Sequence, residues 1–438
     1  MCLSTAIGMD KRFFNLFNLT EDEAIALLDT PPDQLDEEDS RYIAASHLVN
    51  FPTTPSINAL IRAIEQNHPS MDNQIVRRKS VETLGRLKAV SALPLIHTCL
   101  KEDDCYLVEN AVWSIGEIGT TDAEILEDVA QLLNKPKQTY RVIIHTLTYL
   151  HYQPALDRIR PFIENPDPII ASAAITAVYL LSGDQTMMHK VVAMLHHPNV
   201  LARRLSIQDL VNAHYYDAIP QIARCPVSIV FRIRGIRLLA AAGIEAKAIT
   251  FDTIQPHLDQ TIRDHPQDLD LVHHYDTIPP LPQLIQGLYE TDFGRCYLAC
   301  QTILEAYPEA APAALFATYE QEAYRDYGAH FHVMKLFGWL KHAPAYDLLQ
   351  KNLNHPQPQF QKSRAAAAIA LAELGDPRAI PALKACLETK VWDLKYAALM
   401  ALEKLGDTSA HDIVKDDSDL LLRLRAVNSG KKPKTNNQ

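Results

Sequence analysis

The sequence predicts an all-α protein built as an α-solenoid, in which two-helix repeats of about 31 residues stack on one another. Three observations predict this fold class: a helical segment rich in Ala, Leu and Ile recurs, its copies are evenly spaced, and glycine is scarce, at 14 of 438 residues. Equivalent late-helix positions recur every 31 or 32 residues: Leu84, Ile115, Leu147, Val178 and Leu210, and again Leu371 and Leu402. One pair of helices cannot bury its apolar stripe alone, so we expect neighbouring repeats to bury it.

Each repeat is expected to contain two helices. The first begins at a proline, where the missing N–H has no partner to lose: Pro94, Pro220 and Pro381. The second begins near an arginine or a polar pair and ends at a glycine that can adopt the left-handed closing conformation: Gly119, Gly375 and Gly406. The string LGDPRAIPAL at 374–383 is similar to a short HEAT-type repeat.

The repeat pattern divides the chain into five expected segments. Residues 1–70 form a helical N-terminal cap, with a capping cluster at 20–23. Residues 71–244 and 361–410 carry regular repeats, and residues 245–360 carry degenerate repeats rich in Tyr, His, Asp and Arg. Residues 411–438 form a C-terminal helix and a tail without large apolar residues, which we expect to be disordered.

Composition and charge exclude several classes of protein. With 42 Lys and Arg against 53 Asp and Glu, the net charge of −11 disfavours broad nucleic-acid binding, which needs a positive surface. No run of about 18 apolar residues is present, so we expect no membrane insertion. Residues 1–12 lack a continuous apolar stretch and a small-residue cleavage site, so we expect no secretory signal there. Seven scattered cysteines suit free thiols in a reducing compartment.

No strong catalytic motif is present, so candidate sites are clusters of side chains. Arginines recur at the start of the second helices, as at Arg141, Arg204, Arg232 and Arg234. On a concave face they would bind carboxylates or phosphates, whereas an Arg–Asp ladder between repeats is the structural alternative. Trp113, at a core-like position of such a helix, is a further binding candidate.

Two more clusters lie in the degenerate segment. They contain Asp292 and Arg295 at 289–296, and Tyr324, Asp326, Tyr327 and His330 at 322–332. Aromatic faces beside a carboxylate and a guanidinium suit a flat, conjugated, acid-bearing ligand, although a polar helix junction would carry the same residues. The pairs His196-His197 and His273-His274 invite a metal interpretation, but adjacent histidines point in different directions, and we expect no metal site.

The longer strings resemble the E/F-type phycobilin lyases, which are HEAT-repeat proteins. VRRKSVETLGRLKA, ENAVWSIGEIG, LYETDFGRCYLA, YGAHFHVMKLFGWLKHAPAYDLL and WDLKYAALMALEKLGD carry the resemblance, which runs from about residue 9 to 407. The type that it resembles most is the phycoerythrin α-subunit lyase. The repeat signature itself is shared by many proteins, whereas these strings are more specific.

The resemblance implies an enzyme that binds a linear tetrapyrrole, which we expect to be phycoerythrobilin, as its substrate without a permanent cofactor. It would attach the bilin by a thioether bond to a cysteine of an apo-phycobiliprotein α or β subunit, most naturally phycoerythrin α. A second HEAT-repeat lyase chain could take part, in the cyanobacterial cytoplasm or the plastid stroma. The thiol belongs to the partner, so the lyase needs no catalytic cysteine.

The bilin hypothesis assigns a role to each cluster. Proton donors are expected among Asp292, Asp326 and Tyr327, and bilin-binding residues are expected to be Arg141, Arg204, Arg232, Arg295, Tyr324, His330 and Trp113. Two rival classes remain open. One is a non-catalytic adaptor or chaperone that holds a protein partner on its concave face, and the other is a HEAT-like DNA glycosylase, which the acidic charge disfavours.

Overall fold

A computed structural model describes residues 19–31, 34–35, 40–66 and 68–429, and the regular elements in these ranges are all helical. The predicted all-α fold class is therefore confirmed. The chain divides into two compact units, Met1–Gln185 (unit 1) and Thr186–Gln438 (unit 2), which are described separately. Within the described ranges, no helix combines the length and the apolarity that crossing a membrane requires.

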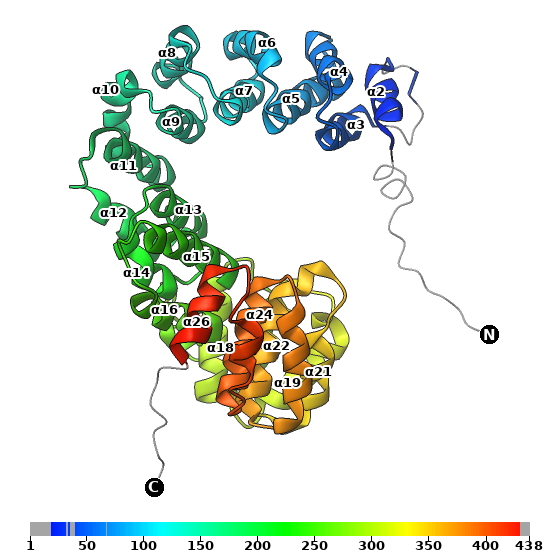
Figure 1. The fold of residues 1–438 in the computed structure, drawn as a ribbon, viewed down its shortest axis with the longest axis vertical. Helices are drawn as coiled ribbons and strands as arrows, with labels where there is room; N and C mark the ends of the chain where they lie inside the picture. Colours follow the sequence, from blue (N-terminus) through cyan, green and yellow to red (C-terminus); the bar gives the residue numbers. More distant parts are fainter. Residues whose placement is uncertain (1–18, 32–33, 36–39, 67, 430–438) are drawn as a thin grey trace. The chain divides into compact units, whose positions relative to one another are not determined.

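Unit 1 is an array of antiparallel helix pairs joined by short turns. Its helices are α2 (Glu21–Asp29), α3 (Arg41–His47), α4 (Thr54–Glu65), α5 (Met71–Arg86), α6 (Leu93–Thr98), α7 (Cys105–Ile118), α8 (Ala123–Gln131), α9 (Tyr140–Tyr149), α10 (Leu156–Ile159) and α11 (Pro168–Ser182). Helices α3, α5, α7 and α9 form one row, and α4, α6, α8 and α10 form the other (Figure 1). The capping cluster starts α2 as predicted, because Thr20 and Glu23 form a reciprocal capping box.

A ladder of side-chain hydroxyls links successive second helices in unit 1. Thr83 donates to the carbonyl of Ala45 (2.9 Å), Ser114 to that of Val81 (2.8 Å) and Thr146 to that of Val112 (3.2 Å). Small residues allow this approach: a Cβ added to Gly85 would lie 2.6 Å from the Ser114 hydroxyl oxygen. The apolar repeat positions named above are all buried, in both units.

Unit 2 begins with the same helix pairs and then folds back on itself. Its helices are α12 (Met188–Ala193), α13 (Val200–Asn212), α14 (Ile219–Arg224), α15 (Ile229–Glu245), α16 (Phe251–Arg263), α17 (Leu281–Gln286), α18 (Phe293–Ala306), α19 (Ala311–Thr318), α20 (Tyr327–Trp339), α21 (Tyr346–Leu353), α22 (Gln361–Leu374), α23 (Ile380–Ala385), α24 (Trp392–Lys404), α25 (Ala410–Val414) and α26 (Leu420–Ser429). Helix α16 contacts α22, α24 and α26, so the last repeats pack against the middle of the chain. The expected tail, 430–438, lies outside the described residues.

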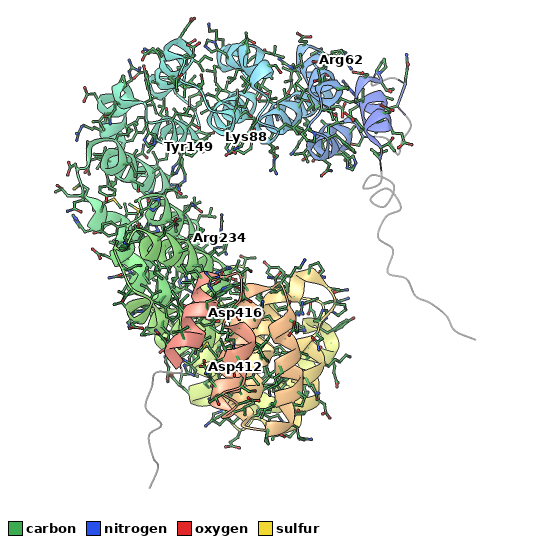
Figure 2. The ribbon with its side chains drawn as sticks, viewed as in Figure 1. Arg62, Lys88, Tyr149, Arg234, Asp412 and Asp416 are labelled. Atoms are coloured by element: carbon green, nitrogen blue, oxygen red, sulfur yellow. The ribbon has the colours of Figure 1, made fainter. Side chains whose placement is uncertain are left out.

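The predicted helix ends are confirmed where proline and glycine mark them. Proline lies in the first turn of α6, α14 and α23, and Gly119 and Gly375 close α7 and α22 with positive φ. Other second helices end without glycine, and a basic residue adopts the left-handed conformation instead: Lys88 (Figure 2), His151, His214, Lys247 and Lys341. These ends could not be predicted from the sequence, because residues with long side chains rarely adopt positive φ.

A buried ion pair joins three helices of unit 2. The guanidinium of Arg232, on α15, donates to Asp264 at the end of α16 and to the hydroxyl of Tyr297 on α18 (3.0 Å). Tyr297 in turn donates to Asp264 (2.9 Å), and burial together with the Asp264 charge raises the Tyr297 pKa well above its usual range. Lys335 of α20 donates to the carbonyls of Ile262 and Arg263 at the same helix end. This network fixes α18 and α20 relative to α15 and α16.

Removing one partner of this buried pair should destabilise unit 2. We expect Arg232→Met to lower the free energy of unfolding by about 3–5 kcal/mol, because Asp264 would remain buried without its cation. Arg234→Met on the same helix, where the arginine is exposed, should change it by less than about 0.5 kcal/mol. Urea unfolding followed by circular dichroism measures both, and equal effects would contradict the structural role of Arg232.

Candidate functional site

The two predicted aspartates begin helices that lie next to each other. Asp292 is the N-cap of α18, where its carboxylate accepts the Gly294 N–H (2.9 Å), and Asp326 is the N-cap of α20, where it accepts the Gly328 and Ala329 N–H groups. Helices α18 and α20 are in contact. The structure therefore brings together the two clusters that the sequence placed 34 residues apart, at the N-terminal ends of neighbouring helices.

Asp292 is held as a carboxylate. Its oxygens accept hydrogen bonds from Arg203 (2.5 Å), a fully buried side chain at the start of α13, and from His273 (3.0 Å). Burial raises the Asp292 pKa, but the hydrogen bonds from Arg203 and His273 outweigh it, and the net pKa is lowered. A carboxylate in this state can accept hydrogen bonds from N–H groups, but it is a poor proton donor at neutral pH.

The tyrosines of the third cluster are exposed. Tyr324 follows a π-helical turn (Tyr319–Ala323), and Tyr327, the first residue of α20, is 54% exposed. His330 instead points into the core, where its Nε2 contacts the Asn352 amide oxygen (3.0 Å), and burial lowers its pKa to about 4. We therefore assign His330 a packing role, while Tyr324 and Tyr327 stay available at the surface.

The arginines at the starts of the second helices are of two kinds: some are buried and bonded inside the core, and others are accessible at the surface. Arg232 is fully buried and its guanidinium is used inside the core, so it is not placed to meet a ligand. Arg234, two residues later on α15, is exposed (Figure 2). Likewise Arg203 is buried, whereas its neighbour Arg204 is half-buried and donates to the Thr291 carbonyl (3.3 Å).

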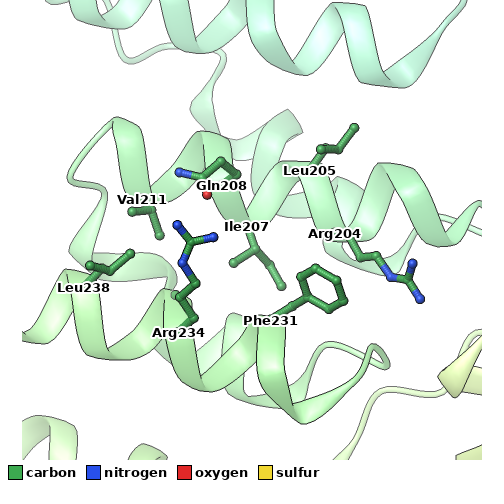
Figure 3. Close-up of a pocket in the computed structure, with 9 residues that line it drawn as sticks. Arg204, Leu205, Ile207, Gln208, Val211, Phe231, Arg234 and Leu238 are labelled. Atoms are coloured by element: carbon green, nitrogen blue, oxygen red, sulfur yellow. The ribbon is translucent and has the colours of Figure 1, made fainter. Parts of the chain in front are cut away.

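A groove between α13 and α15 has these two surface arginines on either side (Figure 3). Its volume is about 190 Å³, and its walls are mostly apolar: Leu205, Ile207, Val211, Phe231, Gly235 and Leu238, with Gln208. The Arg204 guanidinium stacks over the Phe231 ring at 4.9 Å. Exposed Leu201 and Val230 extend the apolar surface. Among the described residues, no carboxylate forms an ion pair with Arg204 or Arg234, which leaves both able to bind an anion.

The other predicted residues lie apart from this groove. Arg295 is exposed on α18. Arg141 and Trp113 belong to unit 1, where Arg141 donates to the Ile169 carbonyl (2.8 Å) and Trp113 is half-buried beneath Arg86. Unit 1 has a cavity of its own, of about 370 Å³, whose lining includes Lys101, Lys135, Lys137 and the acidic Glu102 and Asp103.

One acidic side chain with an unusual environment was missed by sequence reasoning. Asp393 lies in the first turn of α24, and burial raises its pKa while the Arg237 guanidinium of α15 partly offsets this. Arg237 stacks on the neighbouring Trp392 ring at 4.0 Å, which places this turn against α15, one helical turn from Arg234. Nothing in the local sequence signals this contact, because α15 and α24 are far apart in the chain.

The histidine pairs are used in separate contacts. His196 pairs with Asp270 (3.0 Å) and His273 with Asp292, while His274 is exposed beside Asp276. Over the part of the chain that the structure covers, no three His, Cys, Asp or Glu side chains are grouped so that they could hold a metal ion.

Comparison with known proteins adds independent information. Residues 347–429 match a family model described as HEAT repeats. The chain is 63% identical to phycocyanin operon protein Y of Pseudanabaena tenuis (strain PCC 7409), over 95% of this chain and 99% of that protein. It is 31% identical to bilin biosynthesis protein CpeY of Synechococcus sp. (strain WH8020), over 85% of this chain and 91% of that protein. It is 32% identical to phycocyanobilin lyase subunit alpha of Synechococcus elongatus, over 47% of this chain and 80% of that protein.

The two N-cap aspartates allow a matched test of the Asp292 ion pair. Asparagine also caps helices, so Asp292→Asn removes the charge and keeps the cap, and we expect it to lower the free energy of unfolding by about 2 kcal/mol at pH 7. Asp326→Asn, which breaks no ion pair among the described residues, should cost less than about 0.5 kcal/mol.

The same pair has a defined pH dependence. Because the Asp292 pKa is lowered in the folded state, its stabilisation is complete above the unfolded pKa of about 4 and is lost as pH falls through the lowered folded value. The stability gap between the native chain and Asp292→Asn should therefore close in acid, as unfolding at pH 7 and at low pH would measure. A gap independent of pH would contradict the ion pair.

Proposed function

Because the chain belongs to the HEAT-repeat family of bilin lyases and bilin biosynthesis proteins, we propose that it attaches phycoerythrobilin to a cysteine of an apo-phycoerythrin α subunit. The choice of phycoerythrin rests on the strings that resemble the phycoerythrin α-subunit lyases. Two relatives carry phycocyanin or phycocyanobilin in their names, so phycocyanobilin and phycocyanin are the alternative substrates. The bilin is a substrate, and the proposal includes no permanent cofactor.

The observation that carries the proposal is the apolar groove between Arg204 and Arg234. A bilin is a conjugated, largely apolar chain of four pyrroles with two propionate carboxylates. This groove offers an apolar wall, an aromatic ring and two arginines that have no carboxylate partner within the described ranges. An anion-binding pair of this kind is unusual in a chain with a net charge of −11, in which many cations are paired with Asp or Glu.

The chemistry requires a thiol from the partner. The partner's sulfur bonds to the ethylidene carbon of ring A, the thiol proton is released, and a proton is added to the ring, so no group leaves. Burial raises the pKa of the chain's own Cys225 and Cys296 thiols to about 12, which keeps both protonated at neutral pH. The lyase then contributes proximity, by holding the bilin in one conformation while the partner docks.

A proton donor near the bilin would assist the addition. Asp292 is ionised and suits hydrogen bonding to the pyrrole N–H groups, so we place the donor among Asp326, Tyr327 and Asp393. The raised pKa of Asp393 favours it as an acid, because it holds its proton at a higher pH than an ordinary carboxyl does.

The partner is an apo-phycobiliprotein subunit, in the cyanobacterial cytoplasm or the plastid stroma. A second HEAT-repeat chain is part of the proposal, because one relative is named as a subunit of a lyase. That relative aligns with about half of this chain.

A transfer assay tests the proposed function. We expect co-expression of this chain with apo-phycoerythrin α, in cells making phycoerythrobilin, to give a zinc-fluorescent band on a denaturing gel. Parallel arms use apo-phycocyanin subunits, phycocyanobilin and a second HEAT-repeat lyase chain. A band only in the phycocyanin arms would correct the substrate. No band in any arm would contradict the lyase function and favour an adaptor that binds a protein partner.

A second prediction concerns the groove itself. We expect Arg204→Gln/Arg234→Gln to weaken phycoerythrobilin binding by about tenfold or more, because each arginine loses a charge-assisted hydrogen bond. Arg224→Gln is the matched control, since Arg224 is exposed but already paired with Asp270. Absorbance titration of the purified variants measures the affinities. Equal binding by the double variant and the control would show that the groove is not the bilin site.

A further inference from the structure

Lys362 occupies a cage of aromatic rings at the N-terminal ends of three helices. It is the second residue of α22 and only 8% exposed. Its Nζ lies 4.0 Å from the centre of the Phe293 ring, 4.6 Å from that of Tyr327 and 5.1 Å from that of Phe331. Helices α20 and α22 are also closely packed further along, where a Cβ added to Gly338 would lie 2.6 Å from the Ala370 Cα.

The ammonium of Lys362 has no hydrogen-bond or ion-pair partner among the described residues. Lys335, the other buried lysine on a neighbouring helix, differs in this respect, because two carbonyls at the end of α16 accept its hydrogen bonds. Aromatic faces attract a cation, but they replace only part of the hydration that burial removes. A buried cation without a partner lowers the stability of the fold. The position of Lys362 is therefore explained by ligand binding and not by a stabilising role.

The charges around Lys362 support this interpretation. Burial, and more weakly the Arg204 charge, lower its pKa to about 7, while Cys296, Asp264 and Asp326 act in the opposite direction. On α20, His330 and His332 also face it, and both are kept neutral by burial. Arg204 and Lys362 are therefore near enough to repel each other, and a carboxylate between them would stabilise both cations.

Arg204 also connects the cage to the groove. Its guanidinium stacks on Phe231 in the groove and donates to the carbonyl of Thr291, two residues before the cage residue Phe293. Arg204 thus contacts both the groove and the segment that leads into the start of α18, where Phe293 lies. Figure 3 shows Arg204 extending out of the groove, away from Arg234.

We propose that Lys362 binds one carboxylate of a dicarboxylate ligand, shared with Arg204, while Arg234 binds the other. The inference rests on the proposed function, because the ligand is a bilin with two propionates. It assigns the aromatic cage of Phe293, Tyr327 and Phe331 as the wall beside that carboxylate and makes Lys362 a binding residue of the bilin site.

A titration with two forms of the ligand tests the proposal. We expect Lys362→Met to weaken phycoerythrobilin binding by about tenfold and to leave binding of its dimethyl ester, which lacks both carboxylate charges, close to that of the native chain. Lys351→Met, an exposed lysine on α21, is the control for net charge. The affinity of the native chain for the diacid should fall as pH rises from 7 to about 9, because binding requires the Lys362 ammonium, and Lys362→Met should lose this dependence.

The stability of the Lys362→Met variant distinguishes a ligand-binding role of Lys362 from a packing role. Removal of an unpartnered buried cation should leave the melting temperature of Lys362→Met unchanged or raised. Weaker binding of both the diacid and the ester would show that the side chain acts by packing and would overturn the inference. If Lys362→Met bound the diacid as tightly as the native chain does, the inference would also be overturned. The groove would still stand as the bilin site if Arg204→Gln/Arg234→Gln weakened binding. If none of these variants changed binding, the groove would fail as well.

Discussion

The buried pair between Arg232 and Asp264 is the interaction on which the rest of the site depends. Asp264 closes α16 in a left-handed conformation and also accepts the Tyr297 hydroxyl, so one carboxylate fixes the end of α16, the middle of α18 and the start of α15. Arg203 and Asp292 form a similar ion pair one repeat earlier, between α13 and α18. With α18 held in this way, Phe293 at its start lies against the Lys362 ammonium.

The same constraint explains why some arginines remain free for a ligand. On a helix, Arg203 and Arg204 point about 100° apart, and Arg232 and Arg234 about 200° apart, so one member of each pair faces the core and the other faces solvent. The core members meet buried carboxylates, and the outer members lie over an apolar groove with none. Each of these helix starts therefore serves both the fold and the ligand, and α22 adds Lys362 as a third cation that forms no ion pair with any residue that the structure describes.

The sequence predicted what is decided locally. The repeat period, the proline starts, the glycine ends and the capping box at Thr20 all follow from residues within one or two helical turns, and the structure contains them. It could not predict contacts between distant segments. The bond between Arg425 and Asp259 joins residues 166 positions apart and packs the last helix onto α16, which no repeat period indicates. Lys362 begins an alanine-rich helix and carried no signal, because its cage comes from α18 and α20. Arg232 and Arg234 both lie near the start of the same helix, so the repeat pattern alone could not say which one faces the ligand.

A structure of the chain with phycoerythrobilin bound tests the central claim most directly. We expect the tetrapyrrole along the groove between α13 and α15, with one propionate at Arg234 and the other between Arg204 and Lys362. The buried pair of Arg232 and Asp264 should be unchanged, because it positions the site without touching the ligand. A bilin in the lysine-lined cavity of unit 1, or propionates that contact none of the three cations, would contradict the account.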